Sequence, residues 1–205
     1  MRTIGILSNK GGSGKTTLAL NLAVAAMLDG RVTAVVDLDP QVSATSWKDS
    51  READDPVVIA VPYARLPQAL ETARKGGVEL VVIDTPPNTE QPSMAAARAA
   101  DIILIPCRPG ILDIRAIGFT AEAVKAAGKT AYVVLNALPV QASRIIEDAT
   151  QACAAHGLKV APVVMHQRAS YSHAMTVGQT AQEFEPDGKA AEEIRSIWKW
   201  LATVK

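Results

Sequence analysis

Aromatic residues, cysteines and an excess of charge of either sign are all scarce in this sequence of 205 residues. Aromatic side chains make up only 4% of the chain, so the core must be built mainly from Val, Ile, Leu and Ala. The two cysteines, Cys107 and Cys153, are too few for a disulfide framework and lack the CxxC spacing of zinc or redox sites. The 21 basic and 21 acidic residues cancel, so any binding of nucleic acid must come from a local patch.

Long apolar runs are absent as well. No stretch approaches the roughly 20 residues of a membrane-spanning helix, and the first apolar segment, residues 3–7, is too short for a signal peptide. Hydrophobic residues nevertheless make up 48% of the chain and charged residues 20%, which excludes wholesale disorder. We therefore expect one soluble, cytoplasmic domain that covers residues 1–205.

Short β-branched segments alternate with Ala-rich segments of helical length. Most of the β-branched segments are apolar throughout, as strands buried on both faces of a parallel sheet are. Several Ala-rich segments end at a glycine placed as a helix C-cap: Gly30, Gly76, Gly128 and Gly157. The pattern predicts a doubly wound α/β fold of about seven mostly parallel strands with helices on both faces. Predicted strands cover residues 4–7, 32–36, 57–61, 80–83, 102–105, 132–135 and 160–164; predicted helices cover 16–29, 66–75, 93–100, 114–127 and 142–156.

The loop after the first predicted strand has the composition of a phosphate cradle. Glycines allow backbone N–H groups to turn toward phosphate oxygens, and the positive end of the following helix adds to the attraction. In this motif Lys15 would reach the β- and γ-phosphates of a nucleotide, and the Thr16 hydroxyl would ligate Mg²⁺. Asn9 stands where the usual motif has glycine, so the pattern is a deviant form with an extra lysine at its start. The predicted nucleotide-binding residues of this loop are Lys10, Gly11, Gly12, Ser13, Gly14, Lys15, Thr16 and Thr17.

Carboxylates follow two other predicted strands. Asp37 and Asp39 come directly after residues 32–36, in Asp-Leu-Asp-Pro-Gln, and Asp84 opens Asp-Thr-Pro-Pro after residues 80–83. In doubly wound sheets ligands bind beyond the carboxyl ends of the strands, so all three side chains are expected to face the phosphate loop. A hydrophobic strand that ends in aspartate is also the Walker-B pattern, whose carboxylate holds Mg²⁺. A solvated turn is the alternative interpretation of each motif taken alone.

Together these segments resemble the ParA/MinD family of deviant-Walker P-loop ATPases, and in particular the short, ParF-like partition ATPases. The resemblance runs over nearly the whole chain. It implies that Lys10 is the signature lysine, which crosses an ATP-bound dimer to the other subunit's phosphates. It also implies that Lys15 is the ordinary P-loop lysine and that Asp39 orients the attacking water.

The same resemblance implies roles for further residues. Thr16, Asp37 and Asp84 correspond to the residues around Mg²⁺, and Asn136 corresponds to an asparagine that contacts adenine. Arg168 and Lys189 fall in segments that look like the family's DNA-contacting region.

The function implied by the resemblance is an ATPase of weak basal activity. It would form an ATP-dependent homodimer, bind nucleoid DNA without sequence preference, and segregate or position a plasmid, a chromosome locus or a protein cargo. A ParB-like or cargo-adaptor protein would stimulate hydrolysis. Because hydrolysis removes the charge with which Lys10 is paired, the dimer should then loosen.

Two other functions stay open. A MinD-like regulator would cycle on membranes through an amphipathic C-terminal helix. The chain does carry an apolar stripe at helical spacing, formed by Ile194, Ile197, Trp198, Leu201 and Val204, but a helix packed on the sheet, without stable membrane association, is the simpler interpretation. A metabolic or metal-loading ATPase of the same fold is the second alternative, against which the Asp-Pro-Gln motif and the lack of a metal-ligand pair argue.

Overall fold

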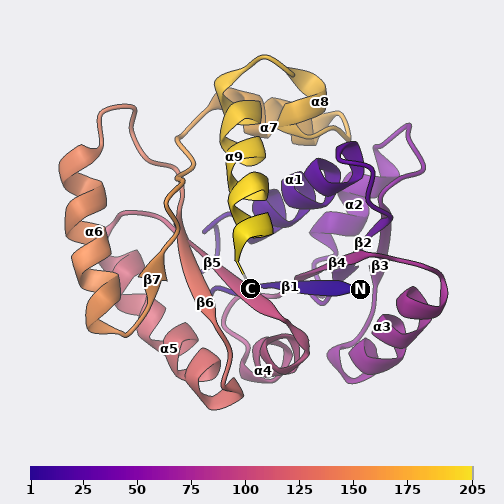
Figure 1. The fold of residues 1–205 in the computed structure, drawn as a ribbon, viewed down its shortest axis with the longest axis horizontal. Coiled ribbons are helices and arrows are strands. Elements are labelled where there is room, and N and C mark those ends of the chain that lie inside the picture. The colour runs from indigo at the N-terminus through magenta and orange to yellow at the C-terminus, as the bar shows by residue number, and fades with distance from the viewer. Residues whose placement is uncertain (205) are drawn as a thin grey trace.

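The computed structural model describes residues 1–204; Lys205, which the predicted domain includes, lies outside the described residues. Seven parallel strands form one sheet in the order β3-β2-β4-β1-β5-β6-β7. Helices cover both faces of this sheet (Figure 1), which confirms the predicted α/β fold. The strands are β1 (Arg2–Ile6), β2 (Thr33–Asp37), β3 (Val57–Ala60), β4 (Leu80–Asp84), β5 (Ile102–Cys107), β6 (Ala131–Leu135) and β7 (Lys159–Val160).

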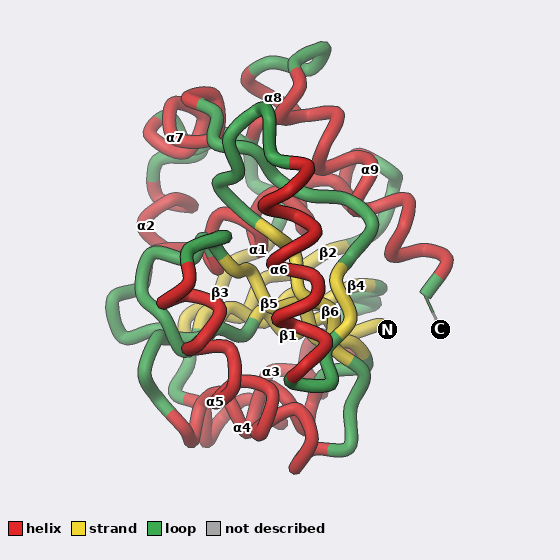
Figure 2. Tube along the Cα trace, turned by 90° about the vertical axis from the view of Figure 1, so that its left-hand side faces the viewer, coloured by secondary structure: helices red, strands yellow, loops and turns green. Residues whose placement is uncertain are grey.

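Two layers of helices enclose the strands, as the side view in Figure 2 shows. Each layer has its own apolar core, because successive residues of a strand point to opposite faces: Val82 joins one core, and Val81 and Ile83 join the other. One layer consists of α1 (Lys15–Leu28), α2 (Ser43–Asp49), α7 (Ala169–Thr176), α8 (Ala181–Phe184) and α9 (Lys189–Thr203). The other consists of α3 (Leu66–Lys75), α4 (Glu90–Ala99), α5 (Ile111–Ala127) and α6 (Ser143–Ala155), with a 3-10 turn (Tyr63–Arg65) before α3.

The helix α1, which follows the glycine-rich loop, is enclosed on all sides. Residues 18–26 are each at most 3% exposed, as expected of a helix that is apolar all round. Its one buried polar side chain in this stretch, Asn21, donates to the carbonyl of Thr17 and accepts the N–H of Ala181 from α8. The start of α1 is therefore fixed by the core, which gives the glycine-rich loop a rigid base.

The helix α9 packs on the body of the protein. Ile194, Ile197 and Leu201 are fully buried in the core that contains α1. The guanidinium of Arg2 donates to the carbonyls of Leu201 and Val204, at 2.8 Å each, and holds the end of α9 beside β1 (Figure 1). The apolar stripe predicted for this helix is thus a core-packing surface. Among the helices of residues 1–204, none combines the length and apolar character needed to cross a membrane.

The last predicted strand is longer than the observed one. Residues 160–164 were expected to be extended, but β7 ends at Val160. A regular parallel ladder would continue with Val163 donating to Leu135, but Met165 does so instead, and two extra residues interrupt the strand. The chain returns to β6 on either side of the break, because Ala161 donates to the carbonyl of Val133 and Met165 to that of Leu135, at 2.8 Å each.

One smaller expectation is confirmed and one is corrected. Gly76 is the C-cap of α3, as predicted, and the residue after it, Gly77, takes the left-handed conformation with φ of 79°. The edge strand β3 is not buried on both faces: Val57 is 50% exposed and Ile59 is 37% exposed, because β3 has a neighbouring strand on one side only.

Candidate nucleotide site

The three predicted loops meet at one edge of the sheet because β2, β4 and β1 are neighbours. In the register of these strands Ile6 lies beside Asp84, and Asp84 lies beside Asp37. The glycine-rich loop leaves β1 directly after Ile6, so the backbone alone brings both carboxylates next to that loop. Both aspartates are buried, at 1% exposure each.

The glycine-rich loop is held on one side and open on the other. Gly12 and Gly14 have φ of 70° and 95°, a conformation that glycine adopts without strain. A Cβ at Gly14 would collide with the amide of Asn136, whose Nδ2 donates to the carbonyl of Ser13 at 2.7 Å. Within the described residues a Cβ at Gly11 or Gly12 would meet no atom within 4 Å. The loop therefore leaves room for a ligand on its outer side while Asn136 supports it from within.

Lys15 points back into the glycine-rich loop. Its Nζ donates to the carbonyl of Lys10 at 3.2 Å, and the residue is 7% exposed. Burial lowers the pKa of Lys15, whereas the nearby carboxylates of Asp84 and Asp39 raise it. A buried ammonium gains from an anionic ligand, because opposite charge restores the preference for the charged form. The position suits the phosphates of a nucleotide.

The carboxylate of Asp84 lacks a partner. Within residues 1–204 neither of its oxygens accepts a hydrogen bond of good geometry. Burial raises the pKa of Asp84 to about 7, and nearby Asp37 adds to the rise, although the Thr16 hydroxyl and the Lys15 ammonium favour the charged form. Leaving a buried carboxylate unpaired is costly, and a cation would remove that cost. Asp37 accepts the N–H groups of Asp39 at 2.9 Å and Ala44 at 3.1 Å, although burial raises its pKa too.

These oxygen donors fit Mg²⁺. Asp37, Asp84 and the hydroxyl of Thr16 are hard ligands, and Mg²⁺ in proteins is held by one or two carboxylates together with substrate phosphates. The described chain has no group of three or more His, Cys, Asp or Glu side chains that could hold a metal ion by themselves. The site therefore needs phosphate oxygens to complete a magnesium shell.

Lys10 and Asp39 lie toward the outside of the site. The Nζ of Lys10 is 2.9 Å from Oδ2 of Asp113, at the start of α5, and the lysine side chain is 40% exposed. Asp39 is half-buried, and its carboxylate accepts the N–H of Gln41 at 2.9 Å. In a single subunit the predicted signature lysine is thus paired with its own α5. The sequence did not indicate Asp113, because it belongs to no motif.

A pocket of about 460 Å³ extends from the glycine-rich loop. On one side it is bounded by Lys15, Thr16 and Asp39. The pocket is also lined by Asn136, which contacts the glycine-rich loop, and by residues that sequence reasoning did not assign to a nucleotide site: Arg108, Ala137, His166, Gln167, Arg168, Tyr171 and Ser172.

The two predicted DNA contacts have different surroundings. Arg168 lies in the wall of this pocket, and its Nη2 is 2.7 Å from Oε1 of Glu193 on α9. Lys189, at the start of α9, has a side chain that is 73% exposed, and its Nζ lies 2.8 Å from Oε2 of Glu192. Lys189 is accessible to a large ligand, whereas Arg168 is held against the protein.

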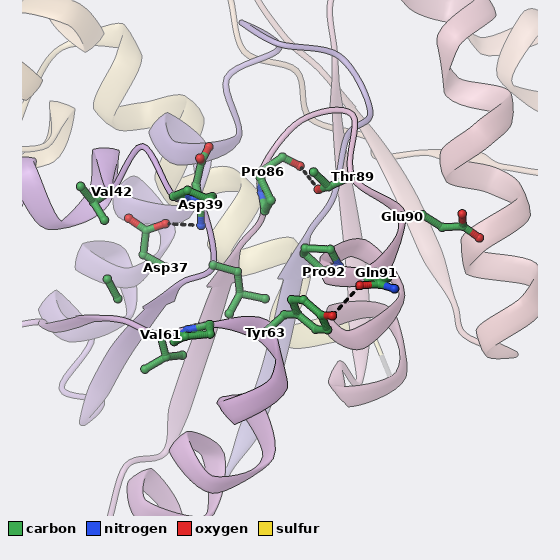
Figure 3. Close-up of a pocket in the computed structure, with 14 residues that line it drawn as sticks. Asp37, Asp39, Val42, Val61, Tyr63, Pro86, Thr89, Glu90, Gln91 and Pro92 are labelled. Carbon is green, nitrogen blue, oxygen red and sulfur yellow. Dashed lines mark hydrogen bonds between the residues drawn. The ribbon is translucent and has the colours of Figure 1, made fainter.

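A second cavity, of about 700 Å³, adjoins the loop that carries Asp39. It lies between the loops after β2, β3 and β4, and apolar side chains such as Val42, Val61 and Pro86 line much of it (Figure 3). On its far side the Tyr63 hydroxyl donates to Oε1 of Gln91 at 2.5 Å. The loops after β2 and β4 therefore separate a polar pocket from an apolar one.

Non-glycine residues with positive φ occur only in the loops around the site, within residues 1–204. They are Val42 (48°), Asn88 (53°) and Ala137 (55°). Such a conformation is unfavourable for side chains with a Cβ, and most of all for a β-branched one. Strained backbone of this kind clusters where loops serve a function.

Comparisons with known proteins agree with this geometry. Residues 4–181 match the family described as the CobQ/CobB/MinD/ParA nucleotide binding domain. The maintenance of carboxysome distribution protein A of Gloeobacter kilaueensis is 32% identical over 210 residues, which cover 97% of this chain and 96% of the relative. The chromosome-partitioning ATPase Soj of Thermus thermophilus is 26% identical, with 96% and 94% covered.

One solved structure shows the likeness in three dimensions. The ATP complex of a McdA variant from Cyanothece has a TM-score of 0.77 at 17% identity, over 100% of this chain and 98% of that one, and supports the fold. The family match spans most of the chain, and a relative above 30% identity is covered almost completely. The chain therefore belongs to the CobQ/CobB/MinD/ParA family of nucleotide-binding proteins.

Proposed function

We propose that this protein is a ParA-type ATPase that dimerises on ATP and positions a cargo in the cytoplasm while it rides on nucleoid DNA. The observation that carries the proposal is that the buried Lys15 lies near Asp84, whose neighbour on β2 is Asp37, at the edge of the glycine-rich loop. A buried cation and an unpartnered buried carboxylate side by side are what a magnesium–triphosphate ligand would satisfy.

Different residues of the site would bind the phosphates, hold Mg²⁺ and orient the attacking water. Phosphoryl transfer to water depends mainly on positioning and on cancelling charge at the γ-phosphate. Lys15 and the backbone N–H groups of the loop would bind the phosphates, and Thr16, Asp37 and Asp84 would hold Mg²⁺, which supplies further positive charge when bound. Asp39, at the border of the pocket, would orient the attacking water and accept its proton.

Lys10 supports a dimer as the active form. Its exposed ammonium is paired with Asp113 rather than with the nucleotide loop of its own subunit. A lysine in this position can exchange Asp113 for the phosphates of a second subunit. Loss of the γ-phosphate would then weaken the contact and return the dimer to single subunits.

The names of the relatives bear on the cargo. A carboxysome distribution protein matches this chain over nearly its full length, which favours a protein assembly as cargo, and the chromosome-partitioning relative keeps a DNA locus as the alternative. A cargo-adaptor or ParB-like protein would stimulate hydrolysis in either case. The exposed Lys189 is our first candidate for contact with DNA phosphates, with Arg168 second.

No observation favours the two alternative functions. A MinD-like membrane cycle would need an apolar helix face free for lipid, but Ile194, Ile197 and Leu201 of the α9 stripe are buried in the core that contains α1, and Trp198 and Val204 pack against it. A metal-loading enzyme would need a cluster of metal-ligating side chains, and residues 1–204 contain none of three or more.

The decisive experiment is ATP turnover by the wild type and by Asp39→Ala. We expect turnover to fall by about 100-fold or more when the water-orienting carboxylate is removed, while ATP affinity stays near that of the wild type. Asp54→Ala, which removes an exposed aspartate outside the site, is the control and should leave turnover unchanged. Normal turnover by Asp39→Ala would disprove the assignment of Asp39, and a wild type that neither binds nor hydrolyses ATP would disprove the proposed function.

A further inference from the structure

One carboxylate on α9 holds several of the residues that line the nucleotide pocket. Oε1 of Glu193 is 2.8 Å from Nε of Arg168 and 2.8 Å from Nδ1 of His166. Oε2 accepts the hydroxyl of Tyr171 at 2.9 Å and the backbone N–H of His166 at 3.2 Å. Every one of these partners belongs to a residue that lines the pocket.

The contacts of Glu193 use the full capacity of its side chain. A carboxylate offers about four acceptor positions, and the Glu193 side chain is 11% exposed. Burial, with Glu193 close by, raises the pKa of Tyr171, so its hydroxyl stays protonated and remains a donor. Removing the carboxylate would leave the guanidinium of Arg168 without its acceptor. The hydroxyl of Tyr171 would keep only the longer contact to the carbonyl of Ala190, at 3.2 Å. Both side chains would then be held less firmly.

We propose that Glu193 is a positioning residue for the nucleoside end of the bound nucleotide. The inference rests on the proposed function, which places the phosphates on the glycine-rich loop. A nucleotide bound in that way can extend only into the remainder of the pocket, whose wall is the segment 166–172 together with Asn136. Glu193 does not line the pocket itself; it fixes Arg168, His166 and Tyr171, which do.

This arrangement links the C-terminal helix to the nucleotide. Glu193 lies in the second turn of α9, and Glu192, the preceding residue, pairs with Lys189 on the surface. The two adjacent carboxylates therefore have different surroundings: Glu193 contacts residues of the pocket wall, and Glu192 faces solvent. The pair provides a matched control, since the same substitution can be made at either position.

The test compares a ligand that has a nucleoside with one that has none. Affinities for ATP and for inorganic tripolyphosphate are measured by calorimetry with Mg²⁺ for the wild type, Glu193→Gln and Glu192→Gln. We expect Glu193→Gln to weaken ATP binding by about tenfold and tripolyphosphate binding by less than about twofold, since only ATP reaches the wall. In turnover the same variant should raise KM for ATP and leave kcat nearly unchanged. Glu192→Gln should resemble the wild type with both ligands.

A second variant covers the case in which Glu193→Gln does not fold. Tyr171→Phe removes one donor without leaving a charge unpaired, and it should weaken ATP binding by about threefold with no effect on tripolyphosphate. Equal losses for both ligands, or no loss for either, would overturn the role of Glu193. A wild type that binds neither ligand would instead overturn the proposed function on which the inference rests.

Discussion

Two charged residues of the site are buried without enough hydrogen-bonding and charged partners within the protein. Asp84 is buried without a hydrogen-bond partner in the described chain, and Lys15 finds only a backbone carbonyl for its ammonium. Arrangements of this kind lower the stability of the empty protein and are relieved when a ligand of the right charge arrives. Because the charge of Asp84 is unfavourable when buried, the stability of the empty protein should depend measurably on pH.

Asp84→Asn should stabilise the empty protein at alkaline pH. The pKa of Asp84 is about 7 in the folded protein and about 3.9 in an unfolded chain. Folding therefore favours the protonated form, so the stabilisation is complete below about pH 4 and is lost as the pH rises through about 7. In EDTA and without nucleotide, the variant should exceed the wild type in free energy of unfolding at pH 8, by up to about 4 kcal/mol.

Urea unfolding at pH 5 and pH 8 checks this expectation. The advantage of Asp84→Asn should shrink strongly at pH 5, where the wild-type carboxyl is already mostly protonated. Asp54→Asn, at an exposed site, should show no such pH-dependent difference. A difference of equal size at both pH values would mean that the charge of Asp84 is not the cause.

Sequence patterns identified the site residues that follow the strands. They did not identify the residues that tertiary packing brings to the site from distant parts of the sequence. Lys15, Asp37 and Asp84 were predictable together because parallel neighbours bring the ends of their strands to one edge. Asp113 and Glu193 belong to no motif, and only tertiary packing places them beside Lys10 and Arg168. Arg168 itself was predicted for DNA binding, a role that remains a prediction.

Among the secondary-structure elements and loops, rigidity and strain are unevenly distributed. The central strands and α1 are enclosed, whereas the loops after β2, β4 and β6 each contain a non-glycine residue at positive φ. Val42, which precedes α2, is the most unfavourable of these because it is β-branched. The strain lies in the loop after Asp39, one of the loops next to the proposed γ-phosphate position.

Val42→Gly should therefore raise the stability of the empty protein. Glycine accepts a positive φ freely, and the gain should exceed the entropy lost to the more flexible unfolded chain, for a net of about 1 kcal/mol. Val57→Gly, at a similarly exposed residue of β3 with ordinary extended backbone, should lower stability instead. Thermal unfolding of both variants without nucleotide checks the contrast, and a loss of stability in Val42→Gly would contradict the strain.

The positions of the strands could be predicted from the local sequence, except where the chain departs from regular β-sheet hydrogen bonding. Each predicted strand occurs, because runs of β-branched residues fit a sheet covered on both faces. The prediction was wrong at the end of β7, where residues 161–164 depart from the regular ladder. The error concerns a few residues at an element's end, where tertiary context decides.

For the molecule as a whole, zero net charge means that DNA must be bound by a local patch if it is bound at all. Lys189→Ala should weaken binding to duplexes of any sequence and reduce the slope of log K against log salt by about one, since one phosphate contact is lost. The control is Lys75→Ala, which removes a similarly exposed, ion-paired lysine from α3 in the other helical layer. Titrations at several salt concentrations check this, and an unchanged slope for Lys189→Ala would place the DNA contact elsewhere.

If Lys10 completes the site of a second subunit, saturation with ATP must double the mass of the protein in solution. Light scattering is measured on the wild type and on Lys10→Ala with Mg²⁺ and a non-hydrolysable ATP analogue at saturation. We predict twice the mass of one chain for the wild type and the mass of one chain for Lys10→Ala. Lys129→Ala, in the loop between α5 and β6 and outside the nucleotide pocket, is the control and should dimerise normally. A wild type that remains a single chain under these conditions, or a Lys10→Ala variant that dimerises as well as the wild type, would contradict the account.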